Sequence, residues 1–166
     1  MNKVDFDRLV EENGGTIYRL CKAYVGDTDD LPDVYQETLI NIWKALPKFR
    51  GDSKVTTWIY RITVNTAISH RRKQKPSING NSDVLDQMEY DNSDTIFKQE
   101  KELQYNKLLK TIEQLKPEHR MIIGLYLEDL SYKEIAEVIG KDTNYVGVNI
   151  GRIKQRLTKM VQHARA

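Results

Sequence analysis

Apolar residues recur three or four positions apart over most of the chain, and no segment alternates strictly between apolar and polar residues. The first spacing is typical of an amphipathic helix, and alternation would be typical of a half-buried strand. We therefore expect an all-α protein. Its first helix is predicted over residues 5–24, where the adjacent glycines Gly14 and Gly15 should interrupt or bend it.

Two further helices are predicted before residue 75. The first has Pro32 in its first turn and ends at Pro47, both positions where proline is compatible with a helix terminus. Its apolar stripe consists of Leu31, Val34, Tyr35, Leu39, Ile42, Trp43 and Leu46. Because Trp43 shares this stripe, we expect it in the core. A turn precedes the second helix, where Trp58 and Ile62 are also expected in the core.

The composition changes between residues 76 and 97. Ser and Asn are frequent there, apolar residues are few, and five acids occur without a Lys or Arg. Such a segment cannot bury enough apolar surface to fold, so we predict a linker that is extended or disordered when free. It divides the chain into two small helical domains, residues 1–75 and 98–166.

The sharpest local pattern lies in the second domain, where helical spacing resumes near Ile96. Ser131 and Glu134 have the spacing of a capping box, in which each side chain accepts a hydrogen bond from a backbone N–H. Gly140 follows where a helix can close with a left-handed residue. The last helix then carries a stripe formed by Val146, Ile150, Ile153, Leu157 and Met160. This arrangement predicts a helix-turn-helix rather than an ordinary helical hairpin.

The formal net charge of +2 hides a strong segregation of charge. Residues 48–75 carry eight Lys or Arg against Asp52 alone, and residues 149–166 carry five Lys or Arg with no acid. Two basic segments separated by the acidic linker predict two nucleic-acid contacts on one polymer. A solvated helix face is the alternative interpretation of each basic segment.

The sequence lacks the marks of several functional classes. It has no run of about 18 apolar residues and no apolar core of a signal peptide near its N-terminus, so we expect a cytoplasmic protein. The single cysteine, Cys21, allows no internal disulfide. The three histidines have no Cys or carboxylate at ligand spacing, and no phosphate loop or nucleophile motif occurs. We expect no enzyme activity, no catalytic residue, no metal or other cofactor, and no small-molecule substrate.

Three blocks of the sequence resemble bacterial sigma factors of the sigma-70 family, in the extracytoplasmic-function group. Residues 30–43, DLPDVYQETLINIW, look like sigma region 2.1–2.2. FRGD at 49–52, followed by TWIYRI at 57–62 and by Asn65, is similar to region 2.3–2.4, and LSYKEIA at 130–136 is similar to region 4.2. The blocks occur in the family's order, and the resemblance covers nearly the whole chain.

The resemblance implies that the chain binds core RNA polymerase. In the family, the helix face that here carries Asp33, Gln36 and Glu37 docks on the clamp helices of the β′ subunit. The spacing of three and four places these side chains on one side of a helix, although a solvated face remains the alternative. The family also uses a second surface against the β flap, whose apolar residues we expect to be mostly core: Ile122, Ile123, Tyr126 and Leu127.

The resemblance also implies recognition of a −10 promoter element. The loop from Lys48 to Lys54 would receive a base flipped out of the opening duplex, and stacking and hydrogen bonds must offset the cost of extracting it. Asparagine can read a base edge, whereas the arginines and lysines at the end of the second helix would mostly meet phosphates. The residues assigned to this contact are Phe49, Arg50, Asp52, Ser53, Arg61, Asn65, Arg71 and Arg72.

In the second domain, the recognition helix would enter the major groove of a −35 element. The positions expected to face outward are Asn144, Tyr145, Val148, Asn149 and Arg152. Gly147 and Gly151 depart from the family's pattern, which commonly has Lys or Arg and an aromatic or His there. One interpretation is close backbone approach to DNA, with Val148 against a thymine methyl. The departure leaves the −35 sequence unpredicted.

These inferences predict a transcription initiation factor that directs polymerase to promoters and aids their opening. The acidic linker would thread the polymerase cleft and RNA exit path, although a plain spacer is the alternative. The family is usually held inactive by an anti-sigma factor that packs between the domains. Two other functions stay open. One is a regulator whose helix-turn-helix binds operator DNA alone, and the other is a decoy that binds polymerase or an anti-sigma factor without opening promoters.

Overall fold

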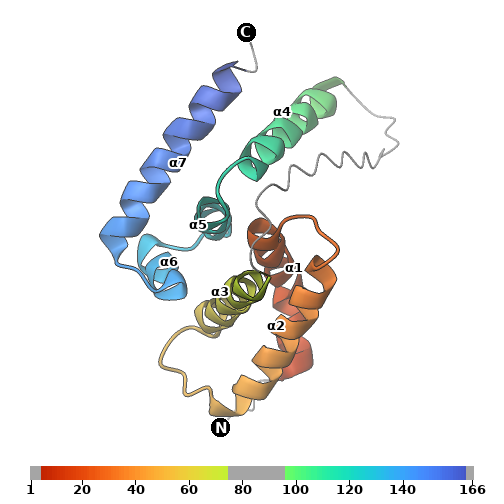
Figure 1. The fold of residues 1–166 in the computed structure, drawn as a ribbon, viewed down its shortest axis with the longest axis vertical. Coiled ribbons are helices and arrows are strands. Elements are labelled where there is room, and N and C mark those ends of the chain that lie inside the picture. Colours follow the sequence, from red (N-terminus) through yellow and green to blue (C-terminus); the bar gives the residue numbers. More distant parts are fainter. Residues whose placement is uncertain (1–4, 75–95, 164–166) are drawn as a thin grey trace.

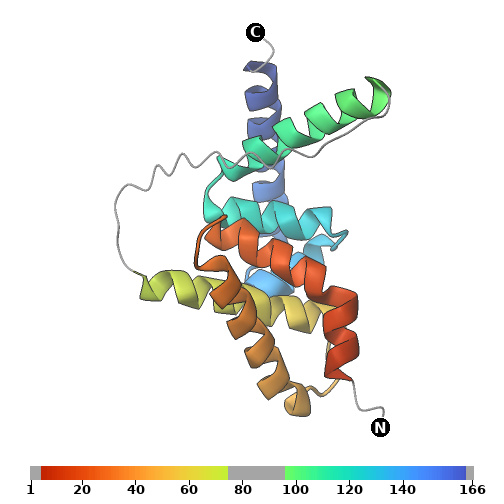
Figure 2. The same ribbon diagram turned by 90° about the vertical axis from the view of Figure 1, so that its right-hand side faces the viewer.

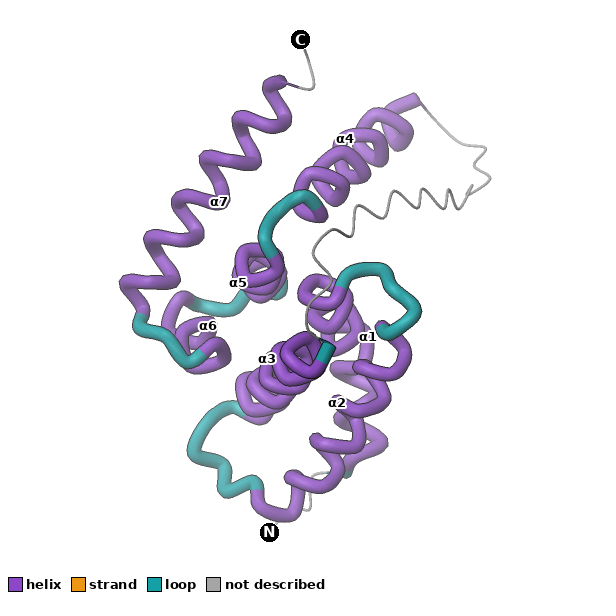
Figure 3. Tube along the Cα trace, in the orientation of Figure 1, coloured by secondary structure: helices purple, strands orange, loops and turns teal. Residues whose placement is uncertain are grey.

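The computed structural model describes residues 5–74 and 96–163, which form seven α-helices and one short 3-10 helix without any strand in those ranges (Figure 1). Figure 3 shows the helices as purple tubes joined by short teal loops. The elements are α1 (Phe6–Val25), α2 (Leu31–Ala45), η1 (Leu46–Lys48), α3 (Val55–Lys73), α4 (Ile96–Glu113), α5 (Pro117–Leu127), α6 (Tyr132–Ile139) and α7 (Thr143–His163). The prediction of an all-α protein with two helical domains is confirmed.

Helix α1 begins where the Asp5 side chain accepts a hydrogen bond from the backbone N–H of Asp7 at 3.1 Å, because that N–H has no partner within the helix. The helix is continuous through Gly14 and Gly15, and Figure 2 shows a marked bend within it. A Cβ on Gly14 would lie 3.2 Å from the hydroxyl of Tyr35, so glycine lets α1 and α2 approach closely here.

Helices α1, α2 and α3 enclose one part of the apolar core. Leu20, Val34 and Ile59 contribute one side chain from each helix, and each is at most 1% exposed. The buried residues of α2 are Leu31, Val34, Thr38 and Ile42, which recur at spacings of three and four. Pro32 lies in the first turn of α2, and η1 begins at the residue before Pro47, as expected from the chemistry of proline.

Cys21 lies inside this core with an exposure of 0%. Its sulfur is 3.7 Å from the Thr38 hydroxyl, which itself donates to the carbonyl of Val34. Burial raises the pKa of the Cys21 thiol to about 11, because the thiolate would lose its hydration. The thiol form therefore prevails in the folded protein at neutral pH.

Cys21 is expected to resist alkylation by iodoacetamide in the native protein and to react readily in 6 M guanidinium chloride, since the thiolate is the reactive species. Intact-mass spectrometry after timed exposure to the reagent would measure both rates. Modification of the native protein at a rate close to that of the denatured chain would contradict the buried position.

Helices α4 to α7 enclose the rest of the apolar core, which is continuous with the part inside α1 to α3. Leu125 of α5, Ile135 of α6 and Ile150 of α7 are each at most 1% exposed. The expected linker, residues 76–97, falls mostly outside the described residues, and its last two positions already belong to α4. None of the helices in the described part of the chain has the length and hydropathy needed to cross a bilayer.

Candidate nucleic-acid and polymerase interfaces

The side of α2 that carries Asp33, Gln36 and Glu37 lies away from the buried residues of the helix. Asp33 and Gln36 are exposed. The side chain of Glu37 is 43% exposed, and its Oε2 lies 4.0 Å from Nδ1 of His70 on α3. The structure thus brings the three predicted polymerase contacts onto an accessible surface, with His70 as a neighbour that sequence reasoning did not identify.

Two large apolar residues continue this surface along α2. Ile40 is 49% exposed and Trp43 is 61% exposed. The prediction that Trp43 lies in the core is wrong. The core stripe of α2 reaches Ile42, and the next residue is rotated by about 100° around the helix, which places Trp43 at the edge of the stripe and in solvent. We define the docking face as Asp33, Gln36, Glu37, Ile40 and Trp43.

The loop between η1 and α3 encloses a hollow of about 140 Å³, which is several times the volume of one water molecule. Its lining contains the four loop residues expected to receive a base, together with two that were not assigned: Phe49, Arg50, Asp52 and Ser53, with Lys48 and Trp58. The ring centroids of Phe49 and Trp58 are 4.9 Å apart at 43°. Gly51 allows the tight turn because its φ is 80°.

Trp58 was expected only in the core, but it is half-buried and also forms one wall of this hollow. The sequence alone could not assign it to both places, since the helical spacing places it beside Ile62, which is half-buried as well. An aromatic pair next to an arginine and an aspartate offers both stacking and hydrogen-bonding groups to a planar ligand. We call this hollow the loop pocket.

Helix α3 separates its core residues from its basic and amide residues. Ile59, Val64 and Ala67 are buried together with one tyrosine and three threonines, whereas Arg61 and Asn65 are exposed one turn apart. The arginines at the end of α3, Arg71 and Arg72, are also exposed, and the Arg71 guanidinium lies 5.6 Å from the centre of the Tyr24 ring. The exposed side of α3 therefore carries an amide and several cations, of which Arg61 lies nearer the loop pocket and Arg71 and Arg72 lie at the far end of the helix.

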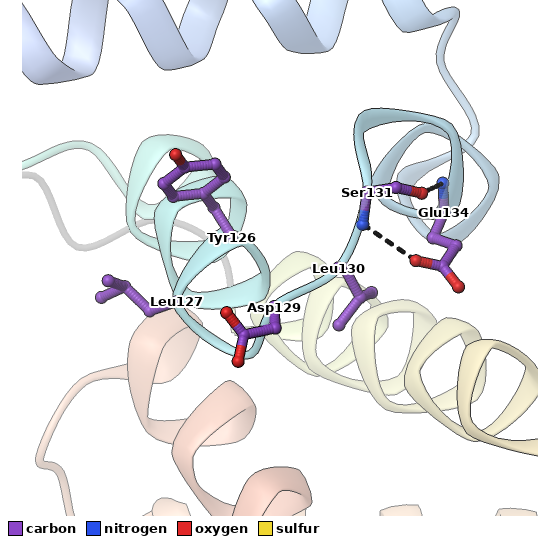
Figure 4. A pocket seen from close by; sticks show the side chains of 6 residues that line it. All are labelled: Tyr126, Leu127, Asp129, Leu130, Ser131 and Glu134. Atoms are coloured by element: carbon purple, nitrogen blue, oxygen red, sulfur yellow. Dashed lines mark hydrogen bonds between the residues drawn. The ribbon is translucent and has the colours of Figure 1, made fainter.

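The helix-turn-helix prediction is confirmed in α6 and α7. The Ser131 hydroxyl accepts from the backbone N–H of Glu134 at 3.2 Å, and the Glu134 carboxylate accepts from the backbone N–H of Ser131 at 2.8 Å (Figure 4). Gly140 ends α6 with a φ of 70°, in the left-handed region. The buried residues of α7 include the expected Val146, Ile150 and Ile153.

The exposed side of α7 differs from the prediction at two positions. Asn144, Val148 and Arg152 are exposed as expected, and Tyr145 is half-buried with Lys141 5.4 Å from its ring centre. The prediction that Asn149 faces outward is wrong, because Asn149 is only 8% exposed and its amide donates to the carbonyl of Tyr145 at 2.8 Å. Asn149 therefore lies on the buried side of α7 and not on its exposed side.

The helix before the turn has a mixed surface. Ile122 and Ile123 are buried and Tyr126 is half-buried, as expected for core residues, but Leu127 is 58% exposed. Leu127 lines an open hollow of about 390 Å³ together with Tyr126, Asp129, Leu130, Ser131 and Glu134 (Figure 4). Lys154 of α7 lies 4.5 Å from the centre of the Tyr126 ring and donates to its hydroxyl at 3.0 Å.

The two helical units contact each other, with α5 against α1 and α6 against α3 (Figure 2). Arg120 donates to the carbonyls of Ala23 at 2.6 Å and Tyr24 at 3.3 Å, which belong to the last turn of α1. Glu128 accepts hydrogen bonds from Thr16 at 3.0 Å and Arg19 at 2.7 Å. We call these contacts the seam. No local pattern in the sequence predicts them, because the paired residues are about 100 positions apart.

Lys54 and Glu134 extend the seam from the loop between η1 and α3 to the helix-turn-helix. The Lys54 ammonium donates to the Glu134 carboxylate at 2.7 Å. This bond and the backbone N–H of Ser131 hold the pKa of Glu134 down at about 2, because both stabilise the ionised form. The hydrogen bond from Arg19 likewise lowers the pKa of Glu128.

Acid is expected to weaken this part of the seam. Because the pKa of Glu134 is depressed in the folded chain, its contribution is present above the ordinary carboxyl pKa of 4.5 and is lost as the pH falls toward about 2. The difference in Tm between the wild type and Glu134→Gln, followed from pH 6 to pH 2, would measure this loss. Glutamine keeps a capping-box partner but carries no charge. A difference that does not change over this range would contradict the assignment.

Comparisons with known proteins agree with this geometry. The family model described as Sigma-70 region 2 matches residues 9–76, and the one described as Sigma-70, region 4 matches residues 105–157. The ECF RNA polymerase sigma-E factor of Escherichia coli (strain K12) is 33% identical over 168 residues, covering 95% of this chain and 86% of the relative. The RNA polymerase sigma-H factor of Pseudomonas aeruginosa is 32% identical over 170 residues, covering 97% and 88%.

Two solved structures share the fold. One is CnrH in complex with the cytosolic domain of CnrY, with a TM-score of 0.66, 22% identity and coverage of 95% of this chain and 88% of that chain. The other is the sigma factor RpoE in complex with the anti-sigma factor NepR from Bartonella quintana, with a TM-score of 0.71, 18% identity and coverage of 95% and 97%. Together with the two family models and the relatives, these matches show that the chain belongs to the extracytoplasmic-function group of the sigma-70 family, transcription initiation factors that bind RNA polymerase and recognise promoters.

Proposed function

We propose that this sigma factor uses the docking face of α2 for polymerase, the loop pocket and α3 for the −10 element, and α7 for the −35 element. The observation that carries the proposal is the loop pocket. Four residues assigned from the sequence to one flipped base line a single hollow: Phe49, Arg50, Asp52 and Ser53. No enzymatic step is assigned to the chain, since polymerase supplies the catalysis, and we place its action with polymerase in the cytoplasm.

The docking face would pack on the clamp helices of the β′ subunit. Acids and an amide on α2 suit basic and amide side chains on the partner, and the exposed Ile40 and Trp43 would add apolar area around those polar contacts. A tryptophan that is 61% exposed in the free chain can become buried when the complex forms. The hollow beside Leu127 is the corresponding candidate for the β flap.

The loop pocket would hold one base extracted from the −10 element. Phe49 and Trp58 would stack on the base or on its neighbour, and Arg50, Asp52 and Ser53 would supply hydrogen bonds to its edge. Arg61 and Asn65 would then meet the adjacent strand, and Arg71 and Arg72 would neutralise phosphates. Stacking of this kind contributes roughly 1–3 kcal/mol per base.

Alanine at Asn65 or Arg61 is expected to lower −10-dependent transcription by about 10-fold each, because one base-edge or backbone contact contributes roughly 1–3 kcal/mol. Both residues are exposed in the free chain, so Tm should change little. Transcript yield from one promoter, measured at equal holoenzyme concentration, gives the effect. A decoy that only binds polymerase would keep its activity in both variants.

Engagement of both elements requires the two units to separate. The −10 and −35 elements lie about 25 base pairs apart, or about 85 Å along B-DNA at 3.4 Å per base pair, whereas α5 and α6 here touch α1 and α3 directly. We propose that the seam opens when polymerase binds, and that the acidic segment of residues 76–97 threads the cleft of the polymerase between the separated units. That segment falls mainly on residues outside the described ranges.

A protein partner that keeps the units together would inhibit this sigma factor. Two proteins of the same fold were solved with a protein partner: CnrH with the cytosolic domain of CnrY, and the sigma factor RpoE with the anti-sigma factor NepR. We propose an anti-sigma factor for this chain also, which would bind across the seam and oppose its opening.

Run-off transcription with core polymerase of the source bacterium and a genomic promoter library tests the proposed function. Discrete start sites that share two upstream elements, and that occur only when this protein is added, are the expected result. Binding to core polymerase without a new start site would indicate the decoy. Salt-sensitive duplex binding without polymerase, and no polymerase binding, would indicate the stand-alone regulator.

A further inference from the structure

The outer row of α7 carries no cation before Arg152, in the third turn of the helix. Asn144, Val148 and Arg152 are exposed and follow one another at a spacing of four, and Gly151 is exposed beside them. From Thr143 to Gly151 the helix contains no Lys or Arg. The residues of a recognition helix that meet base edges lie mainly in these N-terminal turns.

The two glycines of α7 are not explained by packing within the chain. A Cβ on Gly151 would meet no atom within 4 Å, and a Cβ on Gly147 would meet the Tyr132 ring at 3.5 Å, an ordinary contact. Neither glycine has a positive φ. Alanine would therefore fit both positions and would favour the helix more strongly than glycine does. What glycine provides at position 151 is a bare backbone on the exposed side of the helix.

The exposed side chains of these turns suit adenine and thymine. Arginine or lysine provides the commonest specific contact to guanine, and neither occurs within α7 before Arg152. Asparagine pairs with adenine through two hydrogen bonds, and an apolar side chain contacts the thymine methyl. Asn144 offers the amide, and Val148, which is 43% exposed, offers the apolar surface.

We propose that α7 recognises A·T base pairs in the −35 element through Asn144 and Val148, with the bare backbone at Gly151 letting the helix lie deep in the major groove. This proposal rests on the proposed function. The N-terminal turns of α7 contain no Lys or Arg, and A·T base pairs are the expected targets of the side chains that they do expose.

Gly151→Ala separates the contribution to DNA binding from the contribution to folding. The variant is expected to raise Tm by about 2–4 °C, because alanine favours the helix, and to lower −35-dependent transcription by about 10-fold. We define −35-dependent transcription as the ratio of transcript yields from two promoters that share the same −10 element, one with an intact and one with a scrambled −35 element. Thr158→Ala, an exposed helix-favouring change farther along α7, is the matched control and should leave the ratio unchanged.

Base identity is tested by transcription from a library randomised only in the −35 element. Asn144→Arg should shift one selected position from A·T to G·C. Replacing thymine by uracil in the −35 element removes the methyl group. This replacement should lower −35-dependent transcription several-fold with the wild type and should not lower it with Val148→Ala. A G·C-rich selected element, or an unchanged transcription ratio in Gly151→Ala despite a higher Tm, would overturn the inference. Absence of any start site with the wild type would instead overturn the proposed function.

Discussion

Arg120→Met is expected to lower the apparent free energy of unfolding by about 2–4 kcal/mol, because four backbone carbonyls lose a charged donor. The Arg120 guanidinium donates to two carbonyls at the end of α1, and also to those of Glu113 at 3.1 Å and Leu115 at 2.9 Å in its own unit. The last carbonyls of a helix have no intrahelical partner, so Arg120 closes the end of α1 from the other unit. Methionine keeps most of the apolar stem and removes only the donors.

Urea unfolding would measure the stability of Arg120→Met, and small-angle X-ray scattering would measure its compactness. The radius of gyration should increase, because the hydrogen bonds from Arg120 to the end of α1 are gone. Lys54→Ala is the matched control. It also removes a seam contact, but the Lys54 side chain is 75% exposed, and an exposed ion pair contributes at most about 1 kcal/mol. Equal effects of the two substitutions would contradict the special position of Arg120.

Opening of the seam links this stability change to polymerase binding. If polymerase binds only the open form, a variant that opens more easily should bind core polymerase several-fold more tightly, since less free energy is spent on opening. Glu128→Gln removes the charge that binds Arg19 and leaves the contacts of Arg120 within its own unit intact. It should therefore give the tighter binding with a smaller loss of stability. If Arg120→Met and Glu128→Gln both bound core polymerase with wild-type affinity, the contacts of the seam would not oppose polymerase binding.

Glu37→Lys is expected to weaken binding of core polymerase by about 100-fold or more, because it places a positive charge against a partner surface that is proposed to be positive. Juxtaposed like charges in an interface cost several kcal/mol, and a factor of 100 corresponds to about 2.7 kcal/mol. The substitution should change the stability of the free chain little, since the side chain of Glu37 is 43% exposed and its ionic neighbour among the described residues is His70 at 4.0 Å.

Fluorescence anisotropy with labelled sigma factor and core polymerase would measure the affinity. Glu11→Lys on α1 reverses the charge of an exposed residue outside the docking face and serves as the control. Trp43→Ala should weaken binding by about 10-fold with little change in Tm, because its ring is largely exposed in the free chain. Wild-type affinity in Glu37→Lys would remove α2 from the polymerase interface.

The helical elements of this protein follow from local rules that the sequence displays directly. The capping box of Ser131 and Glu134 and the left-handed Gly140 have the same geometry in the structure as their spacing predicts. The prolines at both ends of α2 define that helix for the same reason, since they act on the backbone of their nearest neighbours. Such signals need no knowledge of the rest of the chain.

Local rules do not determine whether a residue at the edge of an apolar stripe is buried or exposed. Trp43 is exposed although the adjacent Ile42 is buried, and Asn149 is buried although the adjacent Val148 is exposed. One residue step turns about 100° around a helix, so burial at these positions depends on which other helix covers that side. A large apolar residue was assigned to the core and a polar residue to the surface, and both assignments were wrong. The backbone carbonyl of Tyr145 satisfies the amide of Asn149, which allows a polar side chain to be buried.

The sequence by itself therefore determined the helices, the two-unit organisation, the segregation of charge and the family to which the protein belongs. The tertiary structure alone decided which aromatic rings line the loop pocket, where Trp43 lies, and how Arg120, Glu128 and Glu134 join the two units. The physical reason is the range of the interactions. Capping and helical spacing act over three or four residues, whereas the seam pairs groups 80 to 112 positions apart, which come together only when the packed helices bring them there.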